Sequence, residues 1–456
     1  MHCLNKHQPM KRLFNKSSIA LTLILLLIGL KNVEGQVTDS ASIETTINLE
    51  PEDTTQQTIA KMYNDIEFLK RFHITGYVQA QYQIADSAGV KGGPGGDFET
   101  NVKNRFSVRR SRFKLTYDKY KSKGVLQVDL SERGVRVVDA YFSITDNKIQ
   151  WFTFTAGIFN KPFGHEVEYG SNVREAPERG RMSSLLFPNE RDLGAKLTIQ
   201  GPKTGIWNWL KLDLALVAGV SSPDANKFTK DYDNHKDLVA HLSANRSNRN
   251  EDFKYGFGVS YYGGSNGNNN DTTYTISSDA NGDKYFKANV VNELGYTKKE
   301  YFGIDFQLQK DFRWGIFTFK GEYIEGTQPG IATSTKSYME KPTTYMYSRS
   351  FNGAYFTLVQ NITRIKSQLI LKYDWYDENA DVEGDEIGKT SAFGKATNNT
   401  DLRYDTFGFG AAYLIDNNTK VLAYYDIIKN ESSTNLAGYT QDINDNIFTL
   451  RFQYKF

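Results

Sequence analysis

The sequence predicts an all-β protein: a 16-stranded antiparallel transmembrane β-barrel with a short N-terminal periplasmic helix and an inward-folded constriction loop. Three observations predict this fold. Sixteen segments alternate apolar and polar residues with the period of two that is typical of strands, their connections alternate between short and long, and the last segment ends on the aromatic residue Phe456. The composition agrees, because 28 Tyr and 29 Phe accompany a mean hydropathy of −0.54. That value is too polar for a helical membrane protein.

The chain of 456 residues begins with the pattern of a secretory signal peptide. A largely apolar run of twelve residues, 19–30, follows four Lys or Arg residues and precedes a short polar run. This run is too short to span a bilayer, and the three-part pattern is that of an export signal. We place cleavage after Gly35. Since the single cysteine is Cys3, the mature chain is expected to contain no disulfide.

Removal of residues 1–35 changes the formal net charge from +2 to −2, because this segment contains five basic residues and one acidic residue. Nucleic-acid binders usually carry a strong basic excess. We therefore expect no nucleic acid among the partners, and any positive field must be local.

Residues 36–72 are predicted to form a periplasmic leader that includes an amphipathic helix. The first part is polar and aperiodic, whereas residues 57–72 place Ile59, Met62, Tyr63, Ile66 and Leu69 at spacings of three and four. Such spacing gives a helix one apolar face. That face either packs on its own domain or forms a short coiled coil between subunits.

Residues 73–456 are assigned to the barrel. Most of its segments have about ten residues, the length of a tilted strand that crosses a bilayer, and an even number of strands closes the sheet without an unpaired edge. The predicted strands are 74–84, 104–117, 124–131, 135–144, 151–159, 191–200, 207–219, 236–246, 253–263, 299–311, 314–325, 350–361, 364–376, 403–415, 418–429 and 446–456.

The connections support a membrane barrel. Those after even-numbered strands are tight, whereas those after odd-numbered strands are mostly long, with one exception near residues 132–134. This alternation places the tight turns on one rim and the long loops on the other, as in bacterial outer-membrane barrels.

The last strand carries Phe448, Leu450, Phe452, Tyr454 and Phe456 on one face. A strand that ends on a carboxyl-terminal Phe resembles the signal read by the β-barrel assembly machinery. We therefore expect Phe456 to engage that machinery, outer-membrane lipid to surround the barrel, and the protein to reside in a cell outer membrane of the Gram-negative type.

The long connection 160–190 is the candidate constriction loop, since sixteen strands enclose an aqueous lumen that something must narrow. Pro162 and Phe163 give it an apolar start, and the run 185–188 (LLFP) is suited to pin it to the wall.

The second strand supplies a basic lumen wall. With Phe113, Leu115 and Tyr117 towards lipid, Arg110, Arg112 and Lys114 face inward, because a basic side chain in mid-membrane on the lipid face costs roughly 2 to 4 kcal/mol. Parity also directs Asp129 and Asp139 inward. Guanidinium groups donate forked, charge-assisted hydrogen bonds to phosphate or carboxylate oxygens. The candidate pore and anion-binding residues are Arg110, Arg112, Lys114, Asp129, Lys161, Arg179, Arg181 and Arg191.

An alternative role for these arginines is structural. They could pair with acids inside the barrel and hold the loop in place. The acids concerned are Asp129, Asp139, Glu166, Glu168, Glu175 and Glu178.

Several runs resemble the phosphate-selective porin O and P family: NRFSVRRSRFKL, VVDAYF, AGIFNKPFGHEVEYGS, ERGRMSSLLFPNERDLGAKL and KYDWYDENADV. The resemblance covers residues 74–456. It implies a sixteen-stranded homotrimeric porin that takes up phosphate or polyphosphate, with Arg110 and Arg112 as pore arginines and Asp129 as the acid of the third strand. Here the inward loop is mixed in charge, with Lys161, Arg174, Arg179 and Arg181 against Glu166, Glu168, Glu175 and Glu178, whereas the family pattern is basic.

The predicted function is passive diffusion of small solutes, with a preference for anions, and involves no enzyme activity, cofactor or metal. A non-specific general porin is the first alternative. An outer-membrane hydrolase and a binding barrel with a plugged lumen are the others. The sequence contains no G-x-S-x-G or H-E-x-x-H motif, and we expect a structural role for His165.

Overall fold

The computed structural model describes residues 54–132, 134–219, 231, 233–268, 270–290, 295–336 and 342–456. The predicted signal peptide and the first part of the leader, up to residue 53, lie outside the described residues. The barrel lies within the compact unit Tyr63–Phe456.

Helix α2 and sixteen strands correspond to predicted elements, whereas helix α3 and strands β10 and β11 do not. The helices are α2 (Thr54–Leu69) and α3 (Arg181–Leu186), with 3-10 turns η1 (Thr363–Ile365), η2 (Gly384–Glu386) and η3 (Asn399–Asp401). The strands are β1 (Phe72–Ala85), β2 (Asn104–Lys119), β3 (Ser122–Ser131), β4 (Gly134–Thr145), β5 (Phe152–Asn160), β6 (Arg191–Gln200), β7 (Leu210–Val217), β8 (Asp237–Ser247), β9 (Phe253–Gly267), β10 (Thr272–Ser278), β11 (Lys284–Val290), β12 (Tyr296–Phe312), β13 (Gly315–Gly330), β14 (Met346–Ile362), β15 (Ser367–Asp377), β16 (Arg403–Leu414), β17 (Thr419–Asn430) and β18 (Ile447–Lys455).

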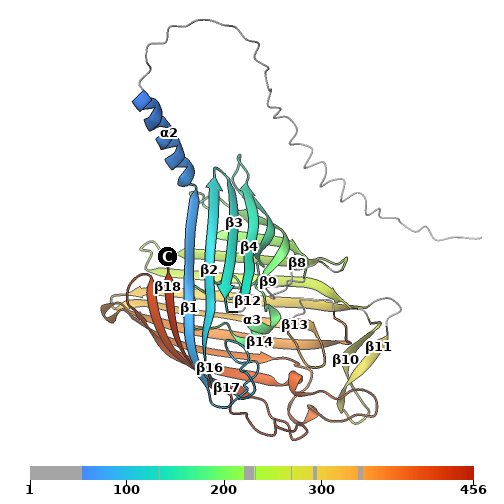
Figure 1. The fold of residues 1–456 in the computed structure, drawn as a ribbon. Coiled ribbons are helices and arrows are strands. Elements are labelled where there is room, and N and C mark those ends of the chain that lie inside the picture. Colours follow the sequence, from blue (N-terminus) through green and yellow to red (C-terminus); the bar gives the residue numbers. More distant parts are fainter. Residues whose placement is uncertain are drawn as a thin grey trace, which may run out of the picture. The chain divides into compact units, whose positions relative to one another are not determined.

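The sheet is a closed antiparallel barrel of sixteen strands, as predicted. Consecutive strands pair along the chain, β9 pairs with β12, and β1 pairs with β18 from Tyr77↔Lys455 to Ala85↔Ile447. The blue first strand therefore lies beside the red last strand in Figure 1. Closure satisfies the backbone groups of both terminal strands, which hydrocarbon requires.

The remaining two strands form a hairpin within the long connection between β9 and β12. In this hairpin, β10 pairs with β11, and β10 also pairs in parallel with the first residues of β14. The sequence predicts no strand between residues 263 and 299, so this hairpin was not expected. It lies in a connection that the barrel pattern leaves unassigned, and its two strands are only seven residues each.

The predicted alternation of short and long connections is confirmed. Tight turns follow β2, β4, β8, β12, β14 and β16, and the connection after β6 has only nine residues. Long connections follow β1, β5, β7, β9, β13, β15 and β17, and the short link between β3 and β4 is the exception that was predicted.

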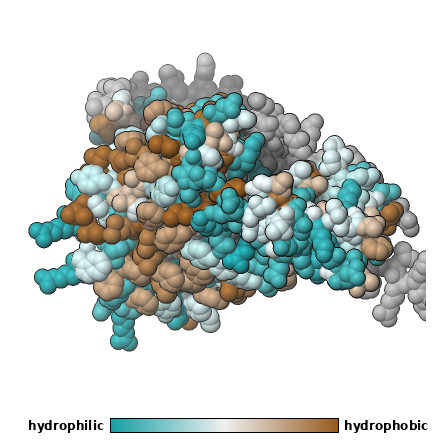
Figure 2. All heavy atoms as spheres, turned by 90° about the horizontal axis from the view of Figure 1, so that it is seen from below, coloured by the Kyte–Doolittle hydropathy of each residue, from teal (hydrophilic) through white to brown (hydrophobic). Residues whose placement is uncertain are grey.

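The barrel exterior is apolar where the sequence alternates. On β12, Phe302 and Ile304 are exposed, whereas Tyr301 and Asp305, which flank them, are buried. Figure 2 shows a broad surface of brown apolar side chains bordered by teal polar ones. Side chains that face outward at these positions are suited to lipid.

No helix among the described residues is long and apolar enough to cross a bilayer.

An apolar cluster also lies inside the barrel. It joins side chains of the inward loop, such as Phe163 and Phe187, to wall residues such as Tyr262 and Tyr301, with Phe163 fully buried. The packed side chains of this cluster therefore fill part of the lumen.

Candidate functional site

The inward loop, residues 161–190, is attached to the wall at its start. Gly164 has a left-handed φ of 58° and its N–H donates to Ser260 Oγ at 2.8 Å. A Cβ atom at this position would lie 1.8 Å from Glu322 Oε1, so the turn requires glycine. Glu322 Oε2 on β13 accepts the backbone N–H groups of His165 and Glu166 at 3.1 and 3.0 Å.

The end of the loop is attached by apolar side chains. Helix α3 buries Met182 and Leu186, and Phe187 follows with its ring 5.0 Å from that of Phe163. The prediction that the LLFP run pins the loop to the wall is therefore confirmed. The two ends of the loop meet in one cluster.

A cavity of about 1000 Å³ lies between this loop and the long connections of the barrel. Its lining includes loop residues from several long connections, such as Gly92, Thr335 and Thr400, together with wall residues of β2 and β15–β17. Nine basic and eight acidic residues line it. The formal charges of the lining therefore nearly cancel. The chemistry of the cavity depends on how the basic and acidic residues are distributed over its walls.

A β-bulge in β2 concentrates arginines on one side of this cavity. Gln79 on β1 pairs with Arg110, but Ala80 pairs with Val108, so Arg109 is an extra residue. A bulge of one residue reverses the parity of the strand. Arg109 and Arg110 therefore both line the cavity, although they are adjacent in sequence.

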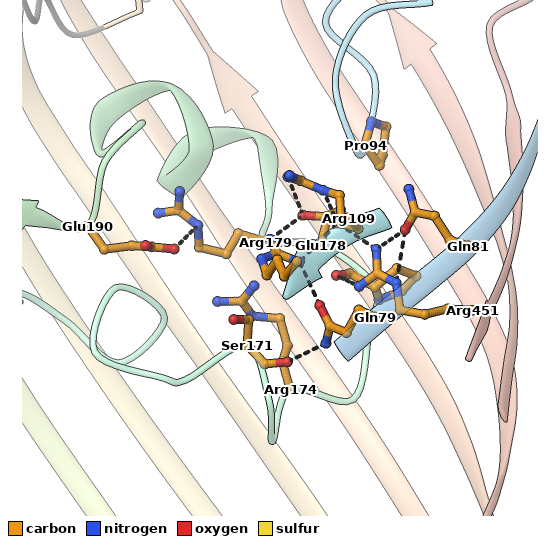
Figure 3. Close-up of polar contacts among 12 residues, drawn as sticks. Gln79, Gln81, Pro94, Arg109, Ser171, Arg174, Glu178, Arg179, Glu190 and Arg451 are labelled. Atoms are coloured by element: carbon orange, nitrogen blue, oxygen red, sulfur yellow. Dashed lines mark hydrogen bonds and ion pairs between the residues drawn. The ribbon is translucent and has the colours of Figure 1, made fainter. Parts of the chain in front are cut away.

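Glu178, in the middle of the inward loop, binds three arginines (Figure 3). Its carboxylate accepts from Arg109 Nε at 2.9 Å, Arg110 Nη2 at 2.9 Å and Arg451 Nη2 at 2.6 Å. Burial alone would raise the pKa of Glu178, but the three guanidinium charges outweigh it and hold the pKa well below its ordinary value. One negative charge is thus set against three positive charges.

Asp129 on β3 has a similar role one strand away. Its Oδ2 lies 3.4 Å from Arg112 Nε and 3.3 Å from Arg136 Nη2. Together, this wall (Arg109, Arg110, Arg112, Arg136 and Arg451, with Glu178 and Asp129) has five arginines for two carboxylates. We call it the basic wall.

A second group of ion pairs lies beside the basic wall. Glu190, at the end of the loop, lies 3.4 Å from Arg179 and 2.5 Å from Arg191, and Arg191 also lies 3.0 Å from Asp139. Burial opposes the charged form of Glu190, yet Arg179 and Arg191 keep its pKa well below the ordinary value. Here bases and acids are equal in number.

The loop glutamates pair with lysines of the barrel wall. Glu166 lies 3.0 Å from Lys372, Glu175 lies 2.6 Å from Lys320, and Glu168 lies 3.7 Å from Lys211. The structural alternative for the charged residues is thus confirmed in part: loop acids do anchor the loop, and three of them pair with lysines that were not predicted.

The structure brings together five of the eight predicted site residues. Arg110, Arg112, Asp129, Arg179 and Arg181 line the cavity, and Arg181 extends from the loop to Glu378, 2.9 Å away. Lys114, Lys161 and Arg191 do not line it. Lys161 is buried against Asp192, 3.3 Å away, and Lys114 is half-buried further along β2.

Sequence reasoning missed Arg109, Arg136 and Arg451. Parity alone places Arg109 on the lipid side, and only the bulge turns it inward. A second register shift between Gln127 and Val128 lies where β3 meets β4. Arg451 could have been predicted from the alternation alone, because it lies between the outward-facing residues Leu450 and Phe452 of the last strand.

The imidazole of His165 makes no side-chain hydrogen bond through Nε2 to any described residue. Its ring lies 4.8 Å from that of Tyr169, and its backbone is held by Glu322. The expected structural role therefore involves the backbone and the ring, and not an imidazole hydrogen bond through Nε2.

No family model and no curated protein matches the chain. Solved structures do match. OprB of Pseudomonas putida is 10% identical with a TM-score of 0.55, and the match covers 86% of this chain and 96% of that one. The outer membrane channel DcaP of Acinetobacter baumannii is 10% identical with a TM-score of 0.49, covering 84% and 97%. An anion-selective porin from Comamonas acidovorans is 9% identical with a TM-score of 0.47, covering 84% and 99%.

The match to OprB shows a shared fold, and identities near 10% show nothing finer. A closed barrel of sixteen strands with an apolar exterior belongs in a bilayer that accepts β-barrels. The protein is therefore an outer-membrane β-barrel of the Gram-negative type.

Proposed function

We propose that this protein is a porin, through which small solutes diffuse passively across the outer membrane, and that it prefers anions. The observation that carries the proposal is the basic wall, where five arginines share two carboxylates. Three of those positive charges are uncompensated within the wall. A confined cavity focuses such a field and raises the local concentration of anions.

The preferred anion is proposed to be phosphate or polyphosphate. The resemblance of the sequence runs to the phosphate-selective porin O and P family supports this choice. The geometry contributes Arg110 and Arg112, because guanidinium groups on the same face of β2 present several donors to one oxyanion.

A non-specific general porin is the second candidate. It is favoured by the cavity lining as a whole, in which nine basic residues face eight acidic ones. In that case both signs of ion pass with similar ease, and the arginines serve to hold Glu178 and the loop.

Ion selectivity in planar bilayers separates these candidates. We expect a reversal potential of the anion-selective sign in a potassium chloride gradient, and a reduction of chloride current by phosphate and polyphosphate. In the double variant Arg110→Ala, Arg112→Ala the preference should fall. A unit charge 4 Å from an ion contributes about 1 kcal/mol in water-like surroundings, or roughly a fivefold change in permeability ratio.

Arg364→Ala is the matched control, because Arg364 is an exposed arginine on the tight turn after β14. Cation selectivity of the native chain would overturn the anion preference. An unchanged effect of phosphate in the double variant would remove β2 from the proposed site. A reconstituted chain without conductance would overturn the porin function itself.

The proposed assembly is a homotrimer. The resemblance implies it, and helix α2 offers one contact, because Ile59, Met62, Ile66 and Leu69 follow the spacing of a coiled-coil seam and are exposed. The mass of the detergent-solubilised full chain tests the assembly, and Ile66→Glu should weaken it. We also propose, on the sequence signal alone, that Phe456 engages the assembly machinery.

A further inference from the structure

The wall of the cavity formed by β15, β16 and β17 differs in charge from the basic wall. Asp374, Asp426 and Tyr424 come from these strands, and Asp445 comes from the connection after β17. Lys372 is the base of this wall, and its Nζ lies 3.0 Å from Glu166 of the loop and 3.9 Å from Asp374. We call Asp374, Asp426, Asp445 and Tyr424 the acidic wall.

Two carboxylates of the acidic wall have acceptor atoms with no donor. Asp426 Oδ2 and Asp445 Oδ1 are buried and make no hydrogen bond to any described residue. The side chains are 6% and 4% exposed, and both line the cavity. Buried acceptors of this kind are uncommon, because an unsatisfied buried polar group costs free energy. They are therefore positioned to accept hydrogen bonds from a donor inside the cavity.

The hydroxyl of Tyr424 adds a third unused group. It is buried, lines the cavity and has no hydrogen-bond partner among the described residues. Tyr424 and Asp426 are two residues apart on β17 and share its inner face. On the neighbouring strand β16, the residue that pairs with Asp426 is Gly408.

Gly408 makes room for this arrangement. A Cβ atom at Gly408 would lie 2.2 Å from Tyr424 Oη. The Tyr424 hydroxyl therefore lies over the backbone of β16 at Gly408, the residue that pairs with Asp426. Gly408 also pairs with Lys372 on its other side. In the row Lys372, Gly408, Asp426, the missing side chain of Gly408 therefore leaves the space that the Tyr424 hydroxyl occupies.

We infer that the acidic wall is a subsite for a protonated amine, with Asp426, Asp445 and Tyr424 as its acceptors. An alkylammonium group has three donors and one positive charge, which match two carboxylates and a hydroxyl oxygen. This inference rests on the proposed function and makes it more specific. A small solute that carries both a protonated amine and an anionic group can meet the acidic wall and the basic wall within one cavity.

Binding to the detergent-solubilised full chain tests the subsite without any need for conductance. The probes are butylammonium, butyrate and the zwitterion 4-aminobutyrate, each titrated by calorimetry. We expect 4-aminobutyrate to bind more tightly than either singly charged probe. In Asp426→Asn, the affinity for butylammonium and 4-aminobutyrate should fall about tenfold, as for loss of one charge-assisted hydrogen bond, and that for butyrate should not.

Two controls separate this result from misfolding and from failure of the porin proposal. Asp381→Asn removes the same charge from an exposed loop residue that does not line the cavity and should leave all three affinities unchanged. Arg110→Ala should weaken the binding of butyrate and should not weaken that of butylammonium. Asp426→Asn is expected to fold, because Asp426 Oδ2 has no partner to lose.

Equal affinity of the native chain and Asp426→Asn for butylammonium overturns the subsite. Binding of butyrate without binding of butylammonium by the native chain also overturns the subsite, but it leaves the proposed anion preference intact. Current in potassium chloride, measured separately, decides whether the protein conducts at all. A non-conducting chain that binds butylammonium through Asp426 would therefore keep the subsite and refute the porin.

Discussion

The two ends of the inward loop and its middle are held by different forces. At the ends, Phe163, Leu186 and Phe187 are buried in one apolar cluster with the wall. In the middle, Glu175 is held by Lys320 and Glu178 by three arginines. Apolar packing carries no charge and depends little on pH. Ion pairs do carry charge, and they set the charge of the cavity. The ends therefore fix the position of the loop, and the middle sets the charge beside the cavity.

Phe163→Ala should have the largest effect on stability. Truncation of a buried aromatic side chain costs about 3 to 5 kcal/mol, and here it opens the cluster that joins both ends of the loop. We expect a lower midpoint in urea unfolding of the lipid-reconstituted barrel and noisier single-channel current. Phe393→Ala, at an exposed loop position, is the control. Equal loss of stability in both variants would show that the cluster does not anchor the loop.

Glu178→Gln should cost less stability and change selectivity more. The loss of one charged acceptor from three arginines costs about 1.5 to 3 kcal/mol, while the basic wall gains one uncompensated positive charge. We expect the reversal potential to move further in the anion-selective direction, which Phe163→Ala should not cause. A shift towards cations would contradict the assignment of the basic wall.

The pH dependence follows from the same residue. The pKa of Glu178 is depressed in the folded protein, so its stabilising contribution is present above the unfolded pKa, about 4.3, and is lost as pH falls through the lower folded pKa. Current noise should therefore stay constant from neutral pH to about 5 and rise only below about 4. Glu178→Gln should lack this rise. A transition near neutral pH in the native chain would mean that another group holds the loop.

Lys114→Met should have the smallest effect. Lys114 is half-buried and lies outside the cavity lining, and charges more than about 8 Å apart are largely screened at physiological salt. The shift in reversal potential should be well below that of Arg112→Met, measured in the same gradient. A shift of equal size would extend the pore wall along β2 and restore Lys114 to the site.

Much of the fold could be predicted, because alternation is a local property of strands. All sixteen barrel strands were located, and so were the two classes of connection. The hairpin β10–β11 was missed because its short strands are stabilised by pairing with β14, residues that are distant in sequence. Helix α3 was missed because its six residues fold against the wall and carry no helical period of their own.

The candidate site was only partly predictable. Alternation directs Arg110 and Arg112 inward once the lipid face of β2 is known, and the structure places both in the cavity. Arg109 could not be found in this way, since the bulge that turns it inward depends on how β1 pairs with β2. The contact of Glu178 with three arginines could not be predicted either, because it depends on the path that the loop takes across the lumen.

The sequence by itself determined that this chain closes into a barrel and that residues 160–190 form a long loop that folds inward, since the alternation period and the loop lengths are local properties of the chain. The tertiary structure decided how the charges are distributed. Ion pairs across the lumen join residues up to 273 positions apart, such as Glu178 and Arg451. Only folding reveals that positive charge exceeds negative on one wall, while Asp426 Oδ2 on the other has no hydrogen-bond partner in the described part of the chain. The reason is that electrostatic energy depends on distance in space and not on distance along the chain.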